Sequence, residues 1–296
     1  ENSMAIVGIF IFYITLNNLL VFSLDELLQI FSDSEKVGKI RGFYLTSINL
    51  AWVLAQLFSS KVLTGSNFPL LYLISFGIMM LFFLLTFFGL KKIPDPKYDK
   101  LPAWKSIKEF IKNKNLARAY KINFLLQFFY SWMVIYTPIY LSLHLGFAWS
   151  EIATIFTIML LPFVFLQIPA GKYSDKIGER KIMMFGFIII SLATLSLFFI
   201  TRHEIWIWAV ALLMTRVGAA IIEIMIDVYF FKHIKKENGE HIGIYRNASP
   251  MAYILGPLSA SILFLIIPSF EFIYLVLGAI MFYGVYLSST IKKSDV

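Results

Sequence analysis

Long apolar runs follow one another along the whole chain, separated by short polar and charged segments. A run of about 20 apolar residues is long enough to cross the roughly 30 Å hydrocarbon core of a bilayer as an α-helix. Nine runs meet this length, and each predicts a membrane-spanning helix. Their ranges are 4–31, 43–64, 69–90, 119–143, 150–171, 182–201, 205–231, 243–267 and 271–291. The pattern therefore predicts an all-α integral membrane protein with nine transmembrane helices.

Composition agrees with this fold class. Of the 296 residues, 59% are hydrophobic and 15% are charged, whereas a typical soluble domain has about 25% charged residues. The chain has no cysteine, which excludes disulfides and thiolate metal sites. It also has no phosphate-binding P-loop of the kind that ATP-driven motors use. We therefore expect neither a metal nor a cofactor.

Basic residues are concentrated in alternate polar segments. If residues 171–181 are placed in the cytoplasm, the alternation of spans places all but three of the 26 lysines and arginines on that side or at its border. The three exceptions are Lys61, Arg202 and Arg216. This distribution follows the positive-inside rule and predicts a plasma or inner membrane protein with a cytoplasmic C-terminus. It attributes the net charge of +8 to topology and lipid contact, not to nucleic-acid binding.

The longest segment between spans covers residues 91–118. Two prolines open it, and five apolar residues then recur on one helical face, with lysines on the other: Leu101, Trp104, Ile107, Phe110 and Ile111. This pattern predicts an amphipathic helix on the inner leaflet, with a solvated linker helix as the alternative. In either case the segment divides the chain into residues 1–90, with three spans, and residues 119–296, with six.

Two segments roughly 200 residues apart repeat the same pattern, which indicates an internal duplication. In each, an Asp ends a long span, a polar turn follows, and the next span opens with Gly-x-Tyr. The first copy has Asp25 and Gly42–Tyr44; the second has Asp227 and Gly243–Tyr245.

A short basic segment, Gly171–Lys181, joins two of the spans. Its two glycines, seven positions apart, permit a sharp reversal of the chain. It resembles the signature loop of the major facilitator superfamily, G-x-x-x-D-[RK]-x-G-[RK]-[RK], at Gly171, Asp175, Lys176, Gly178 and Arg180. It departs from the signature at Glu179, where a basic residue is usual, and at Tyr173, where a small aliphatic residue is usual.

The resemblance implies a fold and a latch. The family is built from two six-helix bundles related as parallel repeats, so the nine spans would correspond to helices four to twelve of twelve. The family's signature loop acts as a cytoplasmic latch between the bundles. Carried over, Asp175 would meet the start of the second span near Gly42, and Arg180 or Lys181 would pair with Asp227. Asp25, at the inner end of the first span, would belong to the same latch.

Ionisable residues inside spans are costly and point to function by default. Arg216, Glu223 and Asp227 share one stripe of the seventh span, because steps of seven and eleven residues return to nearly the same side of a helix. One interpretation is a substrate or proton site in a central cavity, where Glu223 would bind and release the proton. The other is a packing ion pair that involves Arg216.

The fourth span adds polar groups that carry no charge. Asn123, Gln127 and Tyr130 lie at i, i+4 and i+7, on one face of a helix. The resemblance implies that this helix also lines the cavity, where amide and phenol groups could bind a polar ligand. Hydrogen bonding between helices is the alternative.

Together these observations predict secondary active transport of a small molecule by alternating access, with coupling to protons. A facilitative uniporter on the same fold is the first alternative. A membrane-embedded lipid enzyme and a scaffold without transport are alternatives from other classes. We expect no catalytic residues, a monomer in the lipid bilayer, and a small-molecule substrate whose identity the sequence leaves open.

Overall fold

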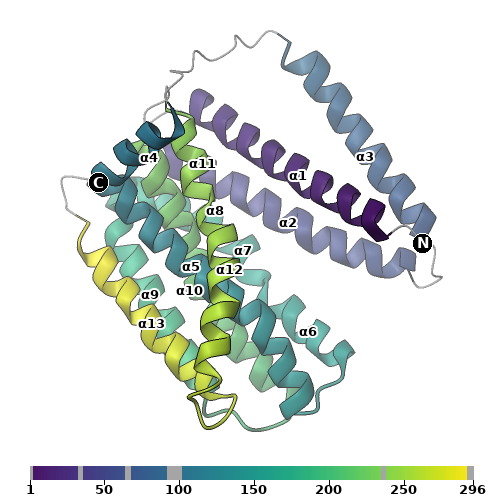
Figure 1. Ribbon diagram of the computed structural model, residues 1–296, viewed down its shortest axis with the longest axis vertical. Coiled ribbons are helices and arrows are strands. Elements are labelled where there is room, and N and C mark those ends of the chain that lie inside the picture. Colours follow the sequence, from purple (N-terminus) through teal and green to yellow (C-terminus); the bar gives the residue numbers. More distant parts are fainter. Residues whose placement is uncertain (1–2, 33–35, 64–67, 92–101, 235–237, 292–296) are drawn as a thin grey trace.

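The computed structural model describes residues 3–32, 36–63, 68–91, 102–234 and 238–291, and these fold into helices joined by short turns (Figure 1). The helices are α1 (Ser3–Phe31), α2 (Val37–Leu63), α3 (Phe68–Gly89), α4 (Ala103–Lys112), α5 (Lys114–Ile139), a π-helical turn (Tyr140–His144), α6 (Trp149–Met159), α7 (Leu161–Phe165), α8 (Gln167–Ile177), α9 (Glu179–Leu197), α10 (Ile205–His233), α11 (Glu240–Arg246), α12 (Ala248–Leu263) and α13 (Phe272–Ser289).

Seven segments of the described chain are long and apolar enough to cross a membrane, where the sequence predicted nine spans. The helices α6, α7 and α8 form one of these segments, Trp149–Ile177. The two expected spans outside this set correspond to α2 and to α11 with α12. In α2, polar residues throughout the helix, among them Arg41, Asn49 and Gln56, lower the hydropathy. Since α12 has only 16 residues, it is about 24 Å long and shorter than the hydrocarbon core.

The helices α5 to α13 pack together around α10 (Figure 1). The helix α10 contacts α5, α6, α8 and α9, while α13 packs on α9 and α5, and α12 packs on α5. Large side chains with no exposed surface, such as Phe129, Phe187, Trp208 and Tyr229, fill the space between these helices. Burial of this kind makes α10 the central element of what we call the C-terminal group, α4 to α13.

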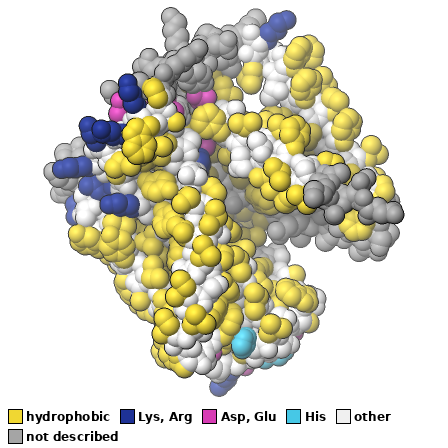
Figure 2. Space-filling view, viewed as in Figure 1, with side chains coloured by type: hydrophobic (Ala, Val, Ile, Leu, Met, Phe, Trp, Pro, Cys, Tyr) yellow, Lys and Arg dark blue, Asp and Glu magenta, His cyan; other side chains and the backbone are white. Residues whose placement is uncertain are grey.

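The helices α1, α2 and α3, here the N-terminal group, lie beside the C-terminal group (Figure 1). The first half of α2 packs on α7, α8 and α10, and α1 contacts α11. In contrast, α3 packs only lightly on α2 and has no buried residue. Large apolar side chains are therefore exposed on α1 and α3 (Figure 2), as suits contact with lipid tails.

The segment that resembles the family signature is more helical than the sequence indicated. The prediction of a loop between Gly171 and Lys181 is wrong, because α8 continues to Ile177 and α9 begins at Glu179. The reversal occurs at Gly178 alone, whose φ of 79° is accessible to glycine at little cost. Gly171 lies inside α8 and serves close helix packing instead.

The amphipathic helix predicted between the two groups is α4. Phe110 is buried against Tyr120, Phe230 and His241, so this part of the apolar face packs on the protein. Three other members of the face, Trp104, Ile107 and Ile111, are exposed, whereas Leu101 lies outside the described residues. Lysines lie nearby, and Figure 2 shows basic side chains gathered at this end of the molecule. We call it the basic end.

Candidate functional site

The carboxylate of Asp175 caps the first turn of α2 at the basic end. The backbone N–H groups of Gly38 and Lys39 donate to its two oxygens, Oδ1 and Oδ2, at 2.9 Å each. The first N–H groups of a helix have no partner within the helix and carry part of the positive end of its dipole. The structure therefore places Asp175 at the start of the second span, where the sequence resemblance expected it, and so joins α8 to α2.

Glycines allow α2 and α8 to approach this closely. Gly38 and Gly42 lie one turn apart on α2, in the small-xxx-small arrangement that permits tight helix crossing in membranes. A Cβ on Gly38 would collide with the carbonyl oxygen of Gly171, and one on Gly171 would collide with that of Gly38. A Cβ on Gly42 would lie 2.7 Å from the carbonyl oxygen of Gln167. The backbones are thus in direct contact.

We expect Gly42→Ala to lower the free energy of unfolding by about 1–3 kcal/mol, the usual cost of overpacking. The added methyl group meets backbone atoms, which cannot rotate away. Thermal unfolding of the purified protein in detergent measures the loss. Gly77→Ala is the matched control, since nothing lies within 4 Å of a Cβ there, and it should leave stability unchanged or slightly higher. Equal effects of the two substitutions would contradict close packing at Gly42.

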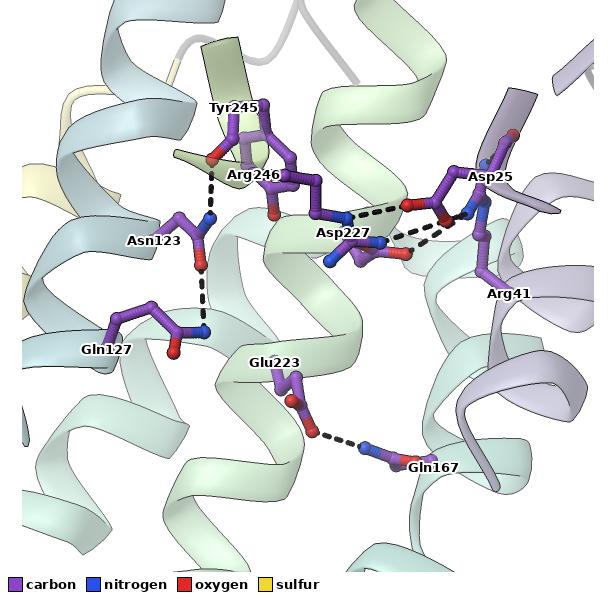
Figure 3. A network of polar contacts seen from close by, with 9 residues as sticks. All are labelled: Asp25, Arg41, Asn123, Gln127, Gln167, Glu223, Asp227, Tyr245 and Arg246. Carbon is purple, nitrogen blue, oxygen red and sulfur yellow. Dashed lines mark hydrogen bonds and ion pairs between the residues drawn. The ribbon is translucent and has the colours of Figure 1, made fainter. Parts of the chain in front are cut away.

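Four charged side chains, three of them buried, form an ion network beside this crossing (Figure 3). Asp25 of α1 pairs with Arg41 of α2 at 2.7 Å, and with Arg246 of α11 through two hydrogen bonds of 2.7 and 3.0 Å. Asp227 of α10 lies 3.3 Å from Arg246 and 3.7 Å from Arg41. Each group of helices therefore supplies one acid and one base, and two of the contacts, Asp25–Arg246 and Asp227–Arg41, cross between the groups.

Little of this network is exposed to solvent. The side chains of Asp25, Arg41 and Asp227 are between 0% and 4% exposed, and that of Arg246 is 33% exposed. The guanidinium of Arg41 also stacks over the ring of Phe231, 3.2 Å from its centroid. Two acids and two bases balance in charge, which is the condition for burying ions without a large penalty.

The prediction that Arg180 or Lys181 pairs with Asp227 is wrong. Asp227 already has Arg246 and Arg41 beside it, and Glu179 occupies the position where the family has a cation. Lys232 of α10 pairs with Glu179 at 2.7 Å and lies 3.8 Å from Asp175. Relative to the family signature the charges of this ion pair are thus reversed, with the acid on α9 and the base on α10. Lys176, also part of the signature, is exposed.

Farther from the basic end, two amide side chains link α2 to α10. Asn49 of α2 donates to Gln167 Oε1 at 3.1 Å, and Gln167 donates to Glu223 Oε2 at 2.7 Å. Gln167 is fully buried and connects α2 with α10 through α8. Glu223 therefore faces the contact between the two groups of helices, as the stripe on α10 predicted, and has an amide rather than a cation as its hydrogen-bond partner.

The other predicted cavity residues are divided between two places, since Asn123 and Gln127 lie near α11 whereas Arg216 lies farther from the basic end. Asn123 donates to the carbonyl of Tyr245 at 3.2 Å, and Gln127 donates to Asn123 Oδ1 at 3.5 Å (Figure 3). Arg216 lies over the rings of Phe129 and Tyr130. Among the described residues Arg216 forms no ion pair with Glu223, so the alternative of a packing pair between these two does not apply.

Sequence reasoning missed several members of the site. In the charge pattern Arg41 and Arg246 are topology signals only, and no motif in the sequence includes Asn49, Gln167 or Lys232. A signal was present, since Arg41 directly precedes one Gly-x-Tyr repeat and Arg246 directly follows the other.

Comparison with known proteins finds a matching family and a similar solved structure. The model of the Major Facilitator Superfamily matches residues 122–291, and no curated protein matches the chain. Among solved structures, the chain is similar to a crystal structure of a bacterial homologue of the iron transporter ferroportin in an outward-facing state. The TM-score is 0.66 and the sequence identity 16%, with 90% of this chain and 66% of that chain covered.

At this identity the structural match shows the fold alone, and this chain spans less than two thirds of that protein's length. The family model, in contrast, covers more than half of this chain and includes the α8–α9 turn, all of α10 and Arg246. The resemblance read from residues 171–180 is therefore confirmed. The chain belongs to the Major Facilitator Superfamily, whose members are multi-pass membrane transporters of small molecules and not enzymes.

Proposed function

We propose that this protein is a secondary active transporter that carries a small molecule across the cytoplasmic membrane by alternating access. The ion network at the basic end supports this most directly, because it joins α1 and α2 to α10 and α11 through reversible polar contacts. In this proposal residues 1–90 and 119–296 belong to two bundles that move against each other, with 91–118 as their connection.

On the positive-inside rule we assign the basic end to the cytoplasm, and we propose that the C-terminus is cytoplasmic as well. With that orientation, the Asp175 cap, the Gly38–Gly171 crossing and the ion network form a cytoplasmic seal. Away from this seal the second half of α2 is exposed at residues such as Trp52 and Leu54, and the two groups part (Figure 2). We infer an outward-open arrangement, in which the seal must break for the substrate to reach the cytoplasm.

Labelling of a cysteine placed at the buried position 174 tests the seal. The chain has no cysteine, so Ser174→Cys would be the sole reporter in it, and Ser174 is 1% exposed at the α2–α8 contact. We expect slow labelling by a membrane-impermeant maleimide in inside-out vesicles. Asp175→Asn should speed this labelling at least about tenfold, since weakening two charge-assisted hydrogen bonds costs more than about 1.4 kcal/mol.

Two controls complete the experiment. Lys176→Gln changes one charge in the same turn but leaves the cap intact, and it should not alter labelling of the reporter. Ser150→Cys, exposed at the other end of the molecule, should be labelled from the outside in every background. If Asp175→Asn and Lys176→Gln label equally, Asp175 does not hold the seal.

We further propose that Glu223 couples transport to protons. It lies in a span, close to the contact between the groups, and its described hydrogen-bond partner is the neutral Gln167. A carboxylate without a paired cation in such a place is costly when ionised, and protonation removes that cost. The alternative is a uniporter in which Glu223 only supports packing.

The similar crystal structure is that of a homologue of an iron transporter. Within the described part of this chain, no group of three or more His, Cys, Asp and Glu side chains could hold a metal ion. We therefore do not propose iron as the substrate.

A further inference from the structure

Arg216 is a buried cation without a counter-ion. It lies on α10 about 17 Å from the first residue of the helix, near the middle of the span, and is 3% exposed. No residue of the described chain forms a hydrogen bond or ion pair with its side chain. Its guanidinium carbon lies 5.3 Å from the ring centroid of Tyr130 and 5.6 Å from that of Phe129. Aromatic faces attract a cation, but they accept few of its five N–H bonds.

Two hydrogen-bond donors are left without acceptors at this place. Nε of Arg216 is buried and has no partner, and the buried hydroxyl of Tyr130 also has none. Nearly all buried polar atoms in proteins are hydrogen-bonded. The acid on the same stripe, Glu223, lies two turns away along α10, about 10 Å, and already accepts a hydrogen bond from Gln167. The site lacks an acceptor and a negative charge.

We propose that Arg216 and Tyr130 bind the carboxylate of a monovalent organic anion, which is the transported substrate. A guanidinium presents a planar fork that matches a carboxylate, and the Tyr130 hydroxyl can donate a further hydrogen bond. One unpaired cation balances one negative charge. Arg41 and Arg246 do not add to it, because Asp25 and Asp227 neutralise them. The rings of Phe129 and Tyr130 provide an apolar surface for the organic part.

The position of the site agrees with the proposed transport cycle, on which this assignment of a substrate class rests. Arg216 is about 17 Å from Asp227 along α10, so the seal lies between the site and the basic end. A ligand at Arg216 would therefore approach from the outside in the present arrangement. Movement of the two groups would then expose it to the cytoplasm.

Thermal unfolding with paired probes tests the assignment. Each pair is a carboxylate and its neutral amide: acetate and acetamide, lactate and lactamide, benzoate and benzamide. We expect at least one carboxylate to raise Tm of the purified protein by about 2 °C or more at saturation, while its amide does not. Arg216→Gln should abolish this shift, and Tyr130→Phe should require a several-fold higher ligand concentration for it. No carboxylate-selective shift, or one that survives Arg216→Gln, would overturn the proposal.

The Tm of the ligand-free protein distinguishes a ligand-binding role of Arg216 from a structural one. Removing an unpaired buried charge should leave Tm of the ligand-free Arg216→Gln protein equal or higher, whereas loss of a structural ion pair would lower it. Arg202→Gln removes one exposed cation and should retain the carboxylate shift. These measurements need no transport. If a carboxylate raises Tm but Asp175→Asn does not speed labelling of Ser174→Cys, alternating access is refuted and the binding site is not. If Asp175→Asn speeds labelling but no carboxylate raises Tm, only the binding site is refuted.

Discussion

Replacing Asp25 with asparagine is expected to lower the free energy of unfolding by about 3–5 kcal/mol, the cost of breaking a buried ion pair from one side. Asp25 accepts hydrogen bonds from both Arg41 and Arg246. Once its charge is removed, Arg41, which has no exposed surface, keeps the backbone carbonyl of Asp25 at 3.2 Å but only the more distant Asp227, at 3.7 Å, as a charged partner. The measurement is thermal or denaturant unfolding of the purified protein.

A double-mutant cycle isolates the pair from the rest of the network. Arg41→Met removes the stranded cation, so Asp25→Asn combined with Arg41→Met should be less destabilised than the sum of the two single variants. Glu26→Gln is the matched control, because Glu26 is the next acid in the chain and pairs with no described cation. Strict additivity in the cycle, or an equal loss in Glu26→Gln, would show that the Asp25–Arg41 contact is not a strong one.

Much of the fold followed from the hydrophobic pattern. Long apolar runs can form only helices in a bilayer, since each backbone polar group must be satisfied within its own segment. The internal repeat also identifies Asp25 and Asp227, and both lie in the ion network. The cap by Asp175 could be expected because a helix start and a carboxylate attract each other wherever the fold brings them together.

Which arginine of the ion network pairs with which aspartate could not be predicted from the sequence. Arg41 and Arg246 are more than 200 positions apart, and whether each meets Asp25 or Asp227 depends on how the helices are rotated and how deeply they pack. A pattern of charges along the chain contains neither quantity. For the same reason the pairing of Lys232 with Glu179 could not be predicted. Glu179 departs from the family signature, and the structure shows that it forms an ion pair in which the two charges are reversed.

The position of Gly171 in a helix, and not in a turn, could not be predicted for a related reason. The sequence shows that Gly171 lacks a side chain but not whether a turn or a neighbouring backbone requires this. The spacing to Gly178 favoured a turn, whereas the structure brings Gly38 against Gly171. Only Gly178 has the positive φ that the loop interpretation assumed for this segment.

The remaining large effect concerns Glu223. In proteoliposomes, Glu223→Gln should abolish proton-driven accumulation, because glutamine resembles the protonated acid and has no proton to release. Exchange of substrate across the membrane should survive, since Gln167 can still hydrogen-bond to an amide at this position. For one proton per substrate, a pH difference of one unit supports about a tenfold concentration ratio in the original protein, and the variant should approach a ratio of one.

The measurement uses a radiolabelled carboxylate that raises Tm in the binding assay, with and without an imposed pH difference. Glu204→Gln is the matched control, because this acid is exposed at the end away from the seal and should leave accumulation intact. Three outcomes are distinct. Loss in Glu223→Gln alone identifies Glu223 as the coupling residue. Accumulation that survives with unaltered pH dependence leaves it a packing residue. Equilibration without accumulation in the unmodified protein establishes the uniporter, in which the carboxylate of Glu223 serves only to tie α10 to Gln167.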